Sequence, residues 1–579
     1  MTPLDHLVLC VSPLGVTFFP SQPSNFPHLK PMKVITLLSL CFCMLLPAVS
    51  ATAQQEHLHP YKSDVWSPDL GNGSYKNPVL YADYSDPDVC AVGEDYYLTA
   101  SSFASMPGLP ILHSRDLVNW EIIGHALTRG LPEAIFDRPA HGKGVWAPAI
   151  RHHEGEFYIY WGDPDQGIFM VKSKDPSGPW DEPVCVIPGR GMIDPCPLWD
   201  DDGRCYLVNG WAASRAGFNS ILTMRELSAD GTRAVGQPRI VFDGGQTNHT
   251  TEGPKLYKRE GLYWILCPAG GVAMGWQLAM RSKSIFGPYE WKRVMWQGHT
   301  SINGPHQGAW IHTAMNEDWF MHFNDRGAYG RVVYLQPVDW SSGWPIMGKQ
   351  GEPYESFRKP KSHSRVIVNP QESDEFNSPS LGKQWQWSAN YNQLYGMPTT
   401  YGTFRLYTAD LDSGSLWDAP NLLLQKPTAP RFVATAKVRF SAKEDGQYGG
   451  VVMMGRDYSS LVLMRQGERF VLQRRTCIGA DEGMSETCKT VATLSPTDAD
   501  TIPYSPAIHI DIYLRQTIDR GSCSFSYSTD GKRFHPAGEV FNMKEGKWIG
   551  AKYGFTAECS HRKTNRGYLD IDWIRVTKL

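Results

Sequence analysis

A short apolar and aromatic run follows a charged or glycine-containing turn five times in the first two thirds of the chain. The runs recur at intervals of about 55–60 residues, a period typical of repeat architectures. They comprise Tyr96–Thr99, Phe157–Tyr160, Cys205–Val208, Leu262–Leu266 and Trp319–His322. Short runs bounded by turns in this way are typical of β-strands rather than of helices.

A second turn occurs later in each unit and keeps the same period. It comprises Ser114–Trp120, Ser173–Trp180, Ser228–Gly231, Ser282–Tyr289 and Asp339–Trp344. Two independent markers therefore recur in step, and helical periodicity is almost absent. The pattern predicts an all-β fold that starts with a five-bladed β-propeller over residues 64–356.

The repeat stops beyond residue 356, and residues 357–372 are interpreted as a linker. From residue 373 to residue 579, apolar and polar residues alternate, as in Phe432–Val438 and Tyr568–Val576. Alternation of this kind is typical of strands with one buried face, so this region is predicted to be a β-sandwich.

Residues 32–53 have the organisation of a signal peptide: Lys33, the apolar run Val34–Leu46 and the small-residue site Ala51–Ala53. Met32 is therefore a better start than Met1, and residues 1–31 are interpreted as a non-native upstream extension. The apolar run is too short to span a membrane. We expect a secreted or periplasmic protein without a membrane span.

Composition narrows the class of partner. The net charge of −3 offers no electrostatic case for nucleic acid. The aromatic content of 12% provides surface that stacks on the apolar faces of sugars. Nine cysteines follow the expected cleavage site, and their spacing shows no metal-binding pattern. Cys477 and Cys488 flank a predicted hairpin loop and are the candidate disulfide.

One residue in each repeat lies 11–14 positions ahead of an aromatic residue of the following run. These residues are Asp86, Trp146, Asp194, Glu252 and His306. The innermost strand of a propeller blade lines the central channel. We therefore expect the five side chains to face the channel at one end and to form a pocket.

Three of these five residues are carboxylic acids, each beside a turn sequence, Asp-Pro or Glu-Gly-Pro. Each turn alone is ordinary, but three in phase suit glycoside hydrolysis, in which one carboxylic acid protonates the leaving oxygen and a carboxylate activates water. Glu252 fits the acid and Asp86 fits the base. Asp194 would keep Glu252 protonated and oriented.

The motifs Tyr84–Val89, Met192–Pro195 and Thr251–Pro254 resemble the base, pKa-modulating and acid motifs of glycoside hydrolase family 43. The segment Asp374–Trp387 is similar to the concanavalin A-like C-terminal domain of the β-xylosidase and α-L-arabinofuranosidase branch of that family. The resemblance implies an inverting exo-glycosidase that removes terminal β-D-xylose or α-L-arabinofuranose from plant polysaccharides or oligosaccharides, and it implies no required cofactor.

The same resemblance implies further substrate-binding residues. Phe103 and Trp146 would stack on the sugar, with blade packing as the alternative role, and Met106 stands where many relatives have an aromatic residue. Arg331 would bind the terminal sugar, with a propeller-closing ion pair as the alternative. His306 would bind sugar hydroxyls or, as in some relatives, help to hold a structural Ca²⁺.

Two rival functions stay open. An endo-arabinanase would need an open groove across the propeller, whereas a pocket walled by the C-terminal domain favours exo action. A non-catalytic carbohydrate-binding propeller would be expected to lack one of the three carboxylates, and all three are present. The choice between xylose and arabinofuranose and the oligomeric state do not follow from the sequence.

Overall fold

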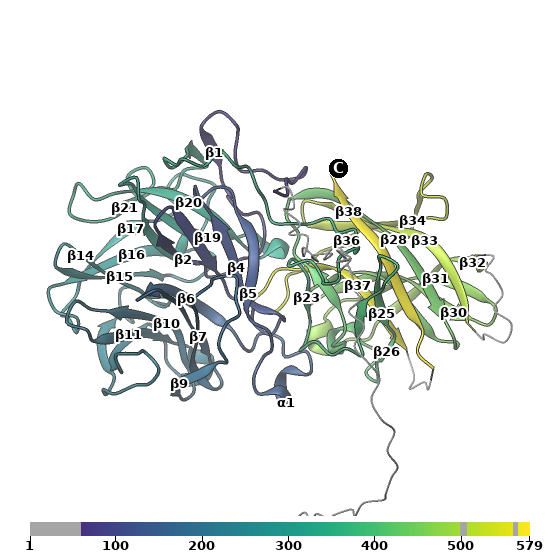
Figure 1. Cartoon of the computed structure of the whole chain (residues 1–579), viewed down its shortest axis with the longest axis horizontal. Coiled ribbons are helices and arrows are strands. Elements are labelled where there is room, and N and C mark those ends of the chain that lie inside the picture. Colours follow the sequence, from purple (N-terminus) through teal and green to yellow (C-terminus); the bar gives the residue numbers. More distant parts are fainter. Residues whose placement is uncertain (1–59, 498–506, 560–564) are drawn as a thin grey trace, which may run out of the picture. The chain divides into compact units, whose positions relative to one another are not determined.

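The computed structural model describes residues 60–497, 507–559 and 565–579, whose regular secondary structure is almost entirely β-strand (Figure 1). The upstream extension and the signal peptide expected from the sequence lie outside the described residues. None of the helices in the described ranges is long and apolar enough to cross a membrane.

Five four-stranded antiparallel sheets, each with its strands in sequence order, form the blades of a propeller in the described chain (Figure 1). The five-bladed propeller predicted from the sequence is therefore confirmed. The strands are β2 (Asp88–Val92), β3 (Asp95–Thr99), β4 (Gly108–Ser114), β5 (Glu121–Leu127); β6 (Trp146–His153), β7 (Glu156–Asp163), β8 (Gly167–Ser173), β9 (Val184–Pro188); β10 (Met192–Trp199), β11 (Cys205–Trp211), β12 (Ile221–Leu227), β13 (Arg239–Asp243); β14 (Lys255–Arg259), β15 (Leu262–Ala269), β16 (Trp276–Ser282), β17 (Glu290–Met295); β18 (His306–His312), β19 (Asp318–Asp325), β20 (Arg331–Asp339) and β21 (Ile346–Met347).

Each aromatic run of the sequence forms the second strand of its blade. Both faces of that strand are largely buried between neighbouring sheets, which explains why the run is apolar. An apolar cluster fills each of the five junctions between described blades. The innermost strands follow one another around the ring, and β18 of the fifth blade lies against β2 of the first. The ring brings residues distant in sequence to one channel.

Two further sheets form the predicted sandwich (Figure 1). The first contains β23 (Gln386–Trp387), β26 (Ala409–Asp410), β27 (Leu423–Gln425), β29 (Gln447–Met454), β30 (Tyr458–Gln466), β31 (Arg469–Cys477), β32 (Thr487–Leu494) and β37 (Lys552–Cys559). The second contains β24 (Gly396–Pro398), β25 (Phe404–Tyr407), β28 (Arg431–Ala442), β33 (Ile508–Asp519), β34 (Ser522–Ser528), β35 (His535–Pro536), β36 (Phe541–Asn542) and β38 (Tyr568–Thr577). Their inward residues form one large core, which extends to Tyr329, Val332 and Tyr334 of the fifth blade.

The remaining elements are short. Strand β1 (Ser74–Lys76) pairs with β22 (Ser356–Arg358). The helical turns are α1 (Glu133–Phe136), α2 (Ala213–Ala216), η1 (Gly327–Tyr329), η2 (Leu416–Asp418) and η3 (Ala480–Glu482).

The prediction of a disulfide between Cys477 and Cys488 is wrong, because both thiols are free. Strands β31 and β32 pair Arg475 with Cys488, so Cys477 lies two residues further along and diagonal to Cys488. Diagonal neighbours in a sheet lie about 7–8 Å apart, whereas a disulfide needs Cα atoms within about 4.4–6.8 Å of each other. The Cys477 thiol instead donates to the carbonyl oxygen of Met484.

Candidate active site

The entry to each innermost strand has the same unusual backbone conformation. One residue per blade has a positive φ there: Asp86 (53°), Ala147 (35°), Asp194 (57°), Gly253 (56°) and Gln307 (54°). Residues other than glycine rarely adopt such angles, and their recurrence is typical of functional sites. Asp86 and Asp194 are therefore equivalent, whereas Glu252 lies one residue ahead of the matching position. The sequence spacing alone had treated the three as equivalent.

Asp86 is buried, and both its carboxylate oxygens accept hydrogen bonds. Arg331 Nη1 donates to Oδ1 at 2.8 Å, and Ser101 Oγ donates to Oδ2 at 2.6 Å. The Ser101 oxygen in turn accepts from the backbone N–H of Ala147 at 2.7 Å, which directs the hydroxyl proton toward Asp86. This orienting role of Ser101 was not found from the sequence, since the contact depends on the pairing of neighbouring blades.

The surroundings of the Asp194 and Glu252 carboxyl groups favour a bound proton on this pair. Asp194 is buried, and its Oδ2 accepts the backbone N–H of Gly253 at 2.7 Å. Burial raises the pKa of Glu252, and the nearby charge of Asp194 raises it further. Burial likewise raises the pKa of Asp194, and the charge of Asp86 adds to that effect. One carboxyl group of the pair is therefore protonated at neutral pH.

Arg331 joins the acidic residues from the fifth blade. Besides its ion pair with Asp86, its guanidinium lies 5.0 Å from the ring centre of Phe323. Its positive charge opposes the rise in the pKa of Glu252. The ion pair links the fifth blade to the entry of the first, so the propeller-closing contact considered from the sequence is present. The side chain also lines a cavity, which leaves the sugar-binding role open to it.

That cavity has a volume of about 280 Å³ and is lined from both regions of the fold. Val272, Asp325 and Arg331 line it from the propeller, and residues 545–549 line it from the sandwich. Trp548 belongs to this sandwich loop, has φ 68° and is half exposed. A bulky residue in that conformation is a backbone outlier.

The aromatic residues predicted to bind sugar lie beside this loop. The Trp146 ring is 6.0 Å from Trp548 and 6.1 Å from Phe103. Trp146 is partly exposed, and its Nε1 donates to the Gly142 carbonyl at 3.1 Å. Phe103 is buried, and it packs edge-on against Trp146. Trp146 is thus partly accessible to a ligand, whereas Phe103 is buried against it.

His306 is buried at the start of β18. Its Nε2 donates to the Gly271 carbonyl at 3.0 Å, and its ring packs edge-on against Phe323. Burial lowers the pKa of His306 to about 4, so the ring is neutral at neutral pH. Its Nδ1 has no hydrogen-bond partner within the described residues. Across that same part of the chain, no cluster of three or more His, Cys, Asp or Glu side chains forms a metal site.

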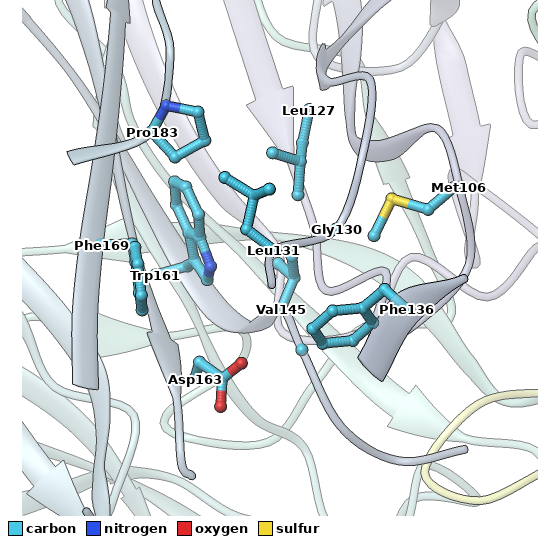
Figure 2. A pocket seen from close by; sticks show the side chains of 11 residues that line it. Met106, Leu127, Gly130, Leu131, Phe136, Val145, Trp161, Asp163, Phe169 and Pro183 are labelled. Atoms are coloured by element: carbon cyan, nitrogen blue, oxygen red, sulfur yellow. The ribbon is translucent and has the colours of Figure 1, made fainter. Parts of the chain in front are cut away.

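Met106 is not among the residues that line the cavity beside Arg331. It points into a separate small cavity of about 20 Å³ between the first two blades, beside Leu127 and Phe136 (Figure 2). Its backbone exchanges two hydrogen bonds with Trp387 of the sandwich. Met106 therefore acts in packing between blades.

Comparison with known proteins gives matches over nearly all of the described chain. The model described as glycosyl hydrolases family 43 matches residues 75–345, and the model described as the beta xylosidase C-terminal concanavalin A-like domain matches residues 373–577. The first match includes strands of all five blades, and the second includes both sheets of the sandwich.

Two curated relatives cover most of the chain. A protein of Formosa agariphila named beta-xylosidase is 30% identical over 602 residues, which cover 94% of this chain and 97% of that protein. A protein of Bacteroides ovatus named non-reducing end alpha-L-arabinofuranosidase BoGH43B is 31% identical over 450 residues, which cover 72% of this chain and 81% of that protein.

Solved structures agree with the fold. A Bacteroides ovatus structure titled xyloglucan PUL GH43B has a TM-score of 0.74 and 26% identity, and the match covers 87% of this chain and all of that one. The structure of the GH43 protein BlXynB from Bacillus licheniformis has a TM-score of 0.75 and 25% identity over the same shares of the two chains.

Proposed function

The chain belongs to glycosyl hydrolases family 43, and we propose that it is an inverting exo-glycosidase that releases terminal β-D-xylose or α-L-arabinofuranose from plant cell-wall polysaccharides or their oligosaccharides. One observation carries the proposal. A carboxyl pair that holds a proton, Asp194 and Glu252, lies close enough to Asp86 and Arg331 for their charges to act on it. The same site therefore contains both a carboxyl group that holds a proton and can act as the acid, and a second carboxyl group, that of Asp86, that can act as the base.

In the proposed reaction, Glu252 donates its proton to the glycosidic oxygen as the bond to the anomeric carbon breaks. Asp86 accepts a proton from a water molecule that attacks the opposite face of that carbon. The leaving alcohol and the free sugar of inverted configuration are the products. Arg331 and Ser101 hold the carboxylate of Asp86 in one orientation, and Asp194 helps to keep Glu252 protonated before the reaction.

The sandwich loop at residues 545–549 supports exo action. It lines the cavity beside Arg331, and a wall at that position favours the end of a sugar chain over its middle. An endo-arabinanase would need an open path through the site. The presence of Asp86, Asp194 and Glu252 together supports catalysis over a purely carbohydrate-binding propeller.

The proposed substrate range is based on the names of the two curated relatives. One is named for xylose release and the other for release of non-reducing-end arabinofuranose. The two sugars place similar hydroxyl groups in a pocket of this kind, so both are proposed for this chain.

The test is proton NMR of p-nitrophenyl α-L-arabinofuranoside and β-D-xyloside during hydrolysis. We expect the first sugar released from at least one substrate to have the inverted anomeric configuration. Release with retention would refute the roles given to Asp86 and Glu252, because a carboxylate would then act as a nucleophile. Turnover of arabinan alone, with internal cleavage, would favour the endo-arabinanase.

We also propose that residues 32–53 direct the protein out of the cytoplasm. Mass spectrometry of the protein recovered from the native host would then give a mature N-terminus near Gln54, and retention of residues 32–53 would contradict the proposal.

A further inference from the structure

A second carboxylate, Asp83, lies three residues ahead of Asp86 and is 1% exposed. Its two oxygens accept hydrogen bonds from three separate parts of the chain. Oδ1 accepts from Ser85 Oγ at 2.7 Å and from the backbone N–H of Arg331 at 2.8 Å. Oδ2 accepts from the backbone N–H of Gly550 in the sandwich at 3.0 Å. One side chain thus joins the entry of the first blade, the fifth blade and the sandwich.

Two glycines let these backbones approach Asp83 and each other. A Cβ on Gly330 would lie 2.5 Å from Asp83 Oδ1, and a Cβ on Gly550 would lie 2.7 Å from the carbonyl oxygen of Tyr329. Beside them, the backbone N–H of Ala551 donates to the Ala328 carbonyl at 2.7 Å. The sandwich loop that carries Trp548 is therefore seated directly on the segment that leads into Arg331.

Two lysines of the sandwich lie close enough to Asp83 for its charge to act on them. Lys426 Nζ lies 4.0 Å from the ring centre of Tyr84, and Lys552 Nζ donates to Ser105 Oγ and to Gln386 Oε1, each at 2.8 Å. Burial lowers the pKa of both lysines, and the charge of Asp83 opposes that effect. Asp83 thus supplies negative charge where the sandwich buries positive charge.

We propose that Asp83 is a positioning residue that couples the seating of the sandwich loop to the ion pair between Arg331 and Asp86. Through its bond to the backbone of Arg331, Asp83 holds the start of β20 in the place from which the guanidinium reaches Asp86. Through its bond to Gly550, it holds the loop that walls the cavity. The inference rests on the proposed function, because it assigns a role in that same site.

Asp83→Asn is the test variant, since an amide keeps the shape of the side chain but replaces one accepting oxygen with an NH₂ group. The NH₂ group faces at least one donor in either orientation. Asp374→Asn is the matched control. Asp374 is also a carboxylate that accepts several hydrogen bonds, from Phe376, Gln384 and Trp385, but all within the sandwich.

A double-mutant cycle on kcat/KM separates positioning from loss of fold. We expect Asp83→Asn to lower kcat/KM for the p-nitrophenyl substrates about 10- to 100-fold, mostly through kcat. In an Arg331→Ala background the same change should cost at least about threefold less than in the parent protein, since the side chain to be positioned is gone and only the effect through the loop remains. Asp374→Asn should leave kcat and KM unchanged. Equal effects of Asp83→Asn in both backgrounds would overturn the proposal.

Hydrogen–deuterium exchange tests the coupling without relying on activity. In Asp83→Asn, peptides covering residues 327–333 and 545–552 should both exchange faster than in the parent protein and in Asp374→Asn. Unchanged exchange in either peptide would overturn the coupling. If the parent protein hydrolysed neither substrate, the proposed function would fail, and the exchange result would still decide the role of Asp83.

Discussion

Replacing the proposed acid should make the protein more stable at alkaline pH while removing its activity. The change is Glu252→Gln, which keeps the size of the side chain and removes its titration. No described residue forms a hydrogen bond with the Glu252 carboxyl group, so the amide breaks no such contact. The cost that it removes is that of ionising a carboxyl group in a largely buried, negatively charged site.

The sign and the size of the expected change in the free energy of unfolding follow from the pKa of Glu252, which is raised from 4.5 to about 8. Between these values the unfolded chain has lost the proton and the folded chain keeps it, so stability falls as pH rises through this window. At about 1.4 kcal/mol for each pKa unit, the upper limit is about 5 kcal/mol. Because Glu252 is partly exposed and shares the effect with Asp194, we expect a gain of about 1–3 kcal/mol for the variant.

The assay is urea unfolding of the parent protein and of Glu252→Gln at about pH 5 and about pH 8.5, with the free energy of unfolding taken from midpoint and slope. The variant should be close to the parent protein at the acidic pH and more stable at the alkaline pH. Glu260→Gln is the control, because Glu260 lies in the same blade with a side chain that is 77% exposed. A difference that does not change with pH, or a loss of stability at the alkaline pH, would refute the reasoning about this site.

Three further predictions concern activity. Asp86→Asn should lower kcat by about 10²–10⁴-fold with unchanged circular dichroism, and near-normal turnover would remove Asp86 from the base role. Asp194→Asn should move the alkaline limb of the kcat/KM profile to lower pH, because the charge of Asp194 helps to raise the pKa of Glu252; an unmoved limb would contradict that coupling. Trp548→Ala should lower kcat/KM about tenfold by removing an aromatic cavity wall, and unchanged kinetics would place the sugar elsewhere.

Local features of the sequence determined the repeat and its strands. The aromatic runs and their turns recur in the chain itself, so the five blades could be predicted before any contact between them was known. The motifs around Asp86, Asp194 and Glu252 likewise marked three carboxylic acids at, or within one residue of, matching places. Both inferences depend on spacing along the chain, which the sequence displays directly.

Only the tertiary structure decided how those groups interact. Burial and neighbouring charge determine that Glu252 and Asp194 favour holding a proton, and residues far apart in sequence create both. The same holds for Asp83, whose three donors come from its own turn, from the fifth blade and from the sandwich. Strand register, which the local pattern around Cys477 did not specify, separated that thiol from Cys488. Contacts across blades and sheets arise from packing, and packing is not a property of any one segment.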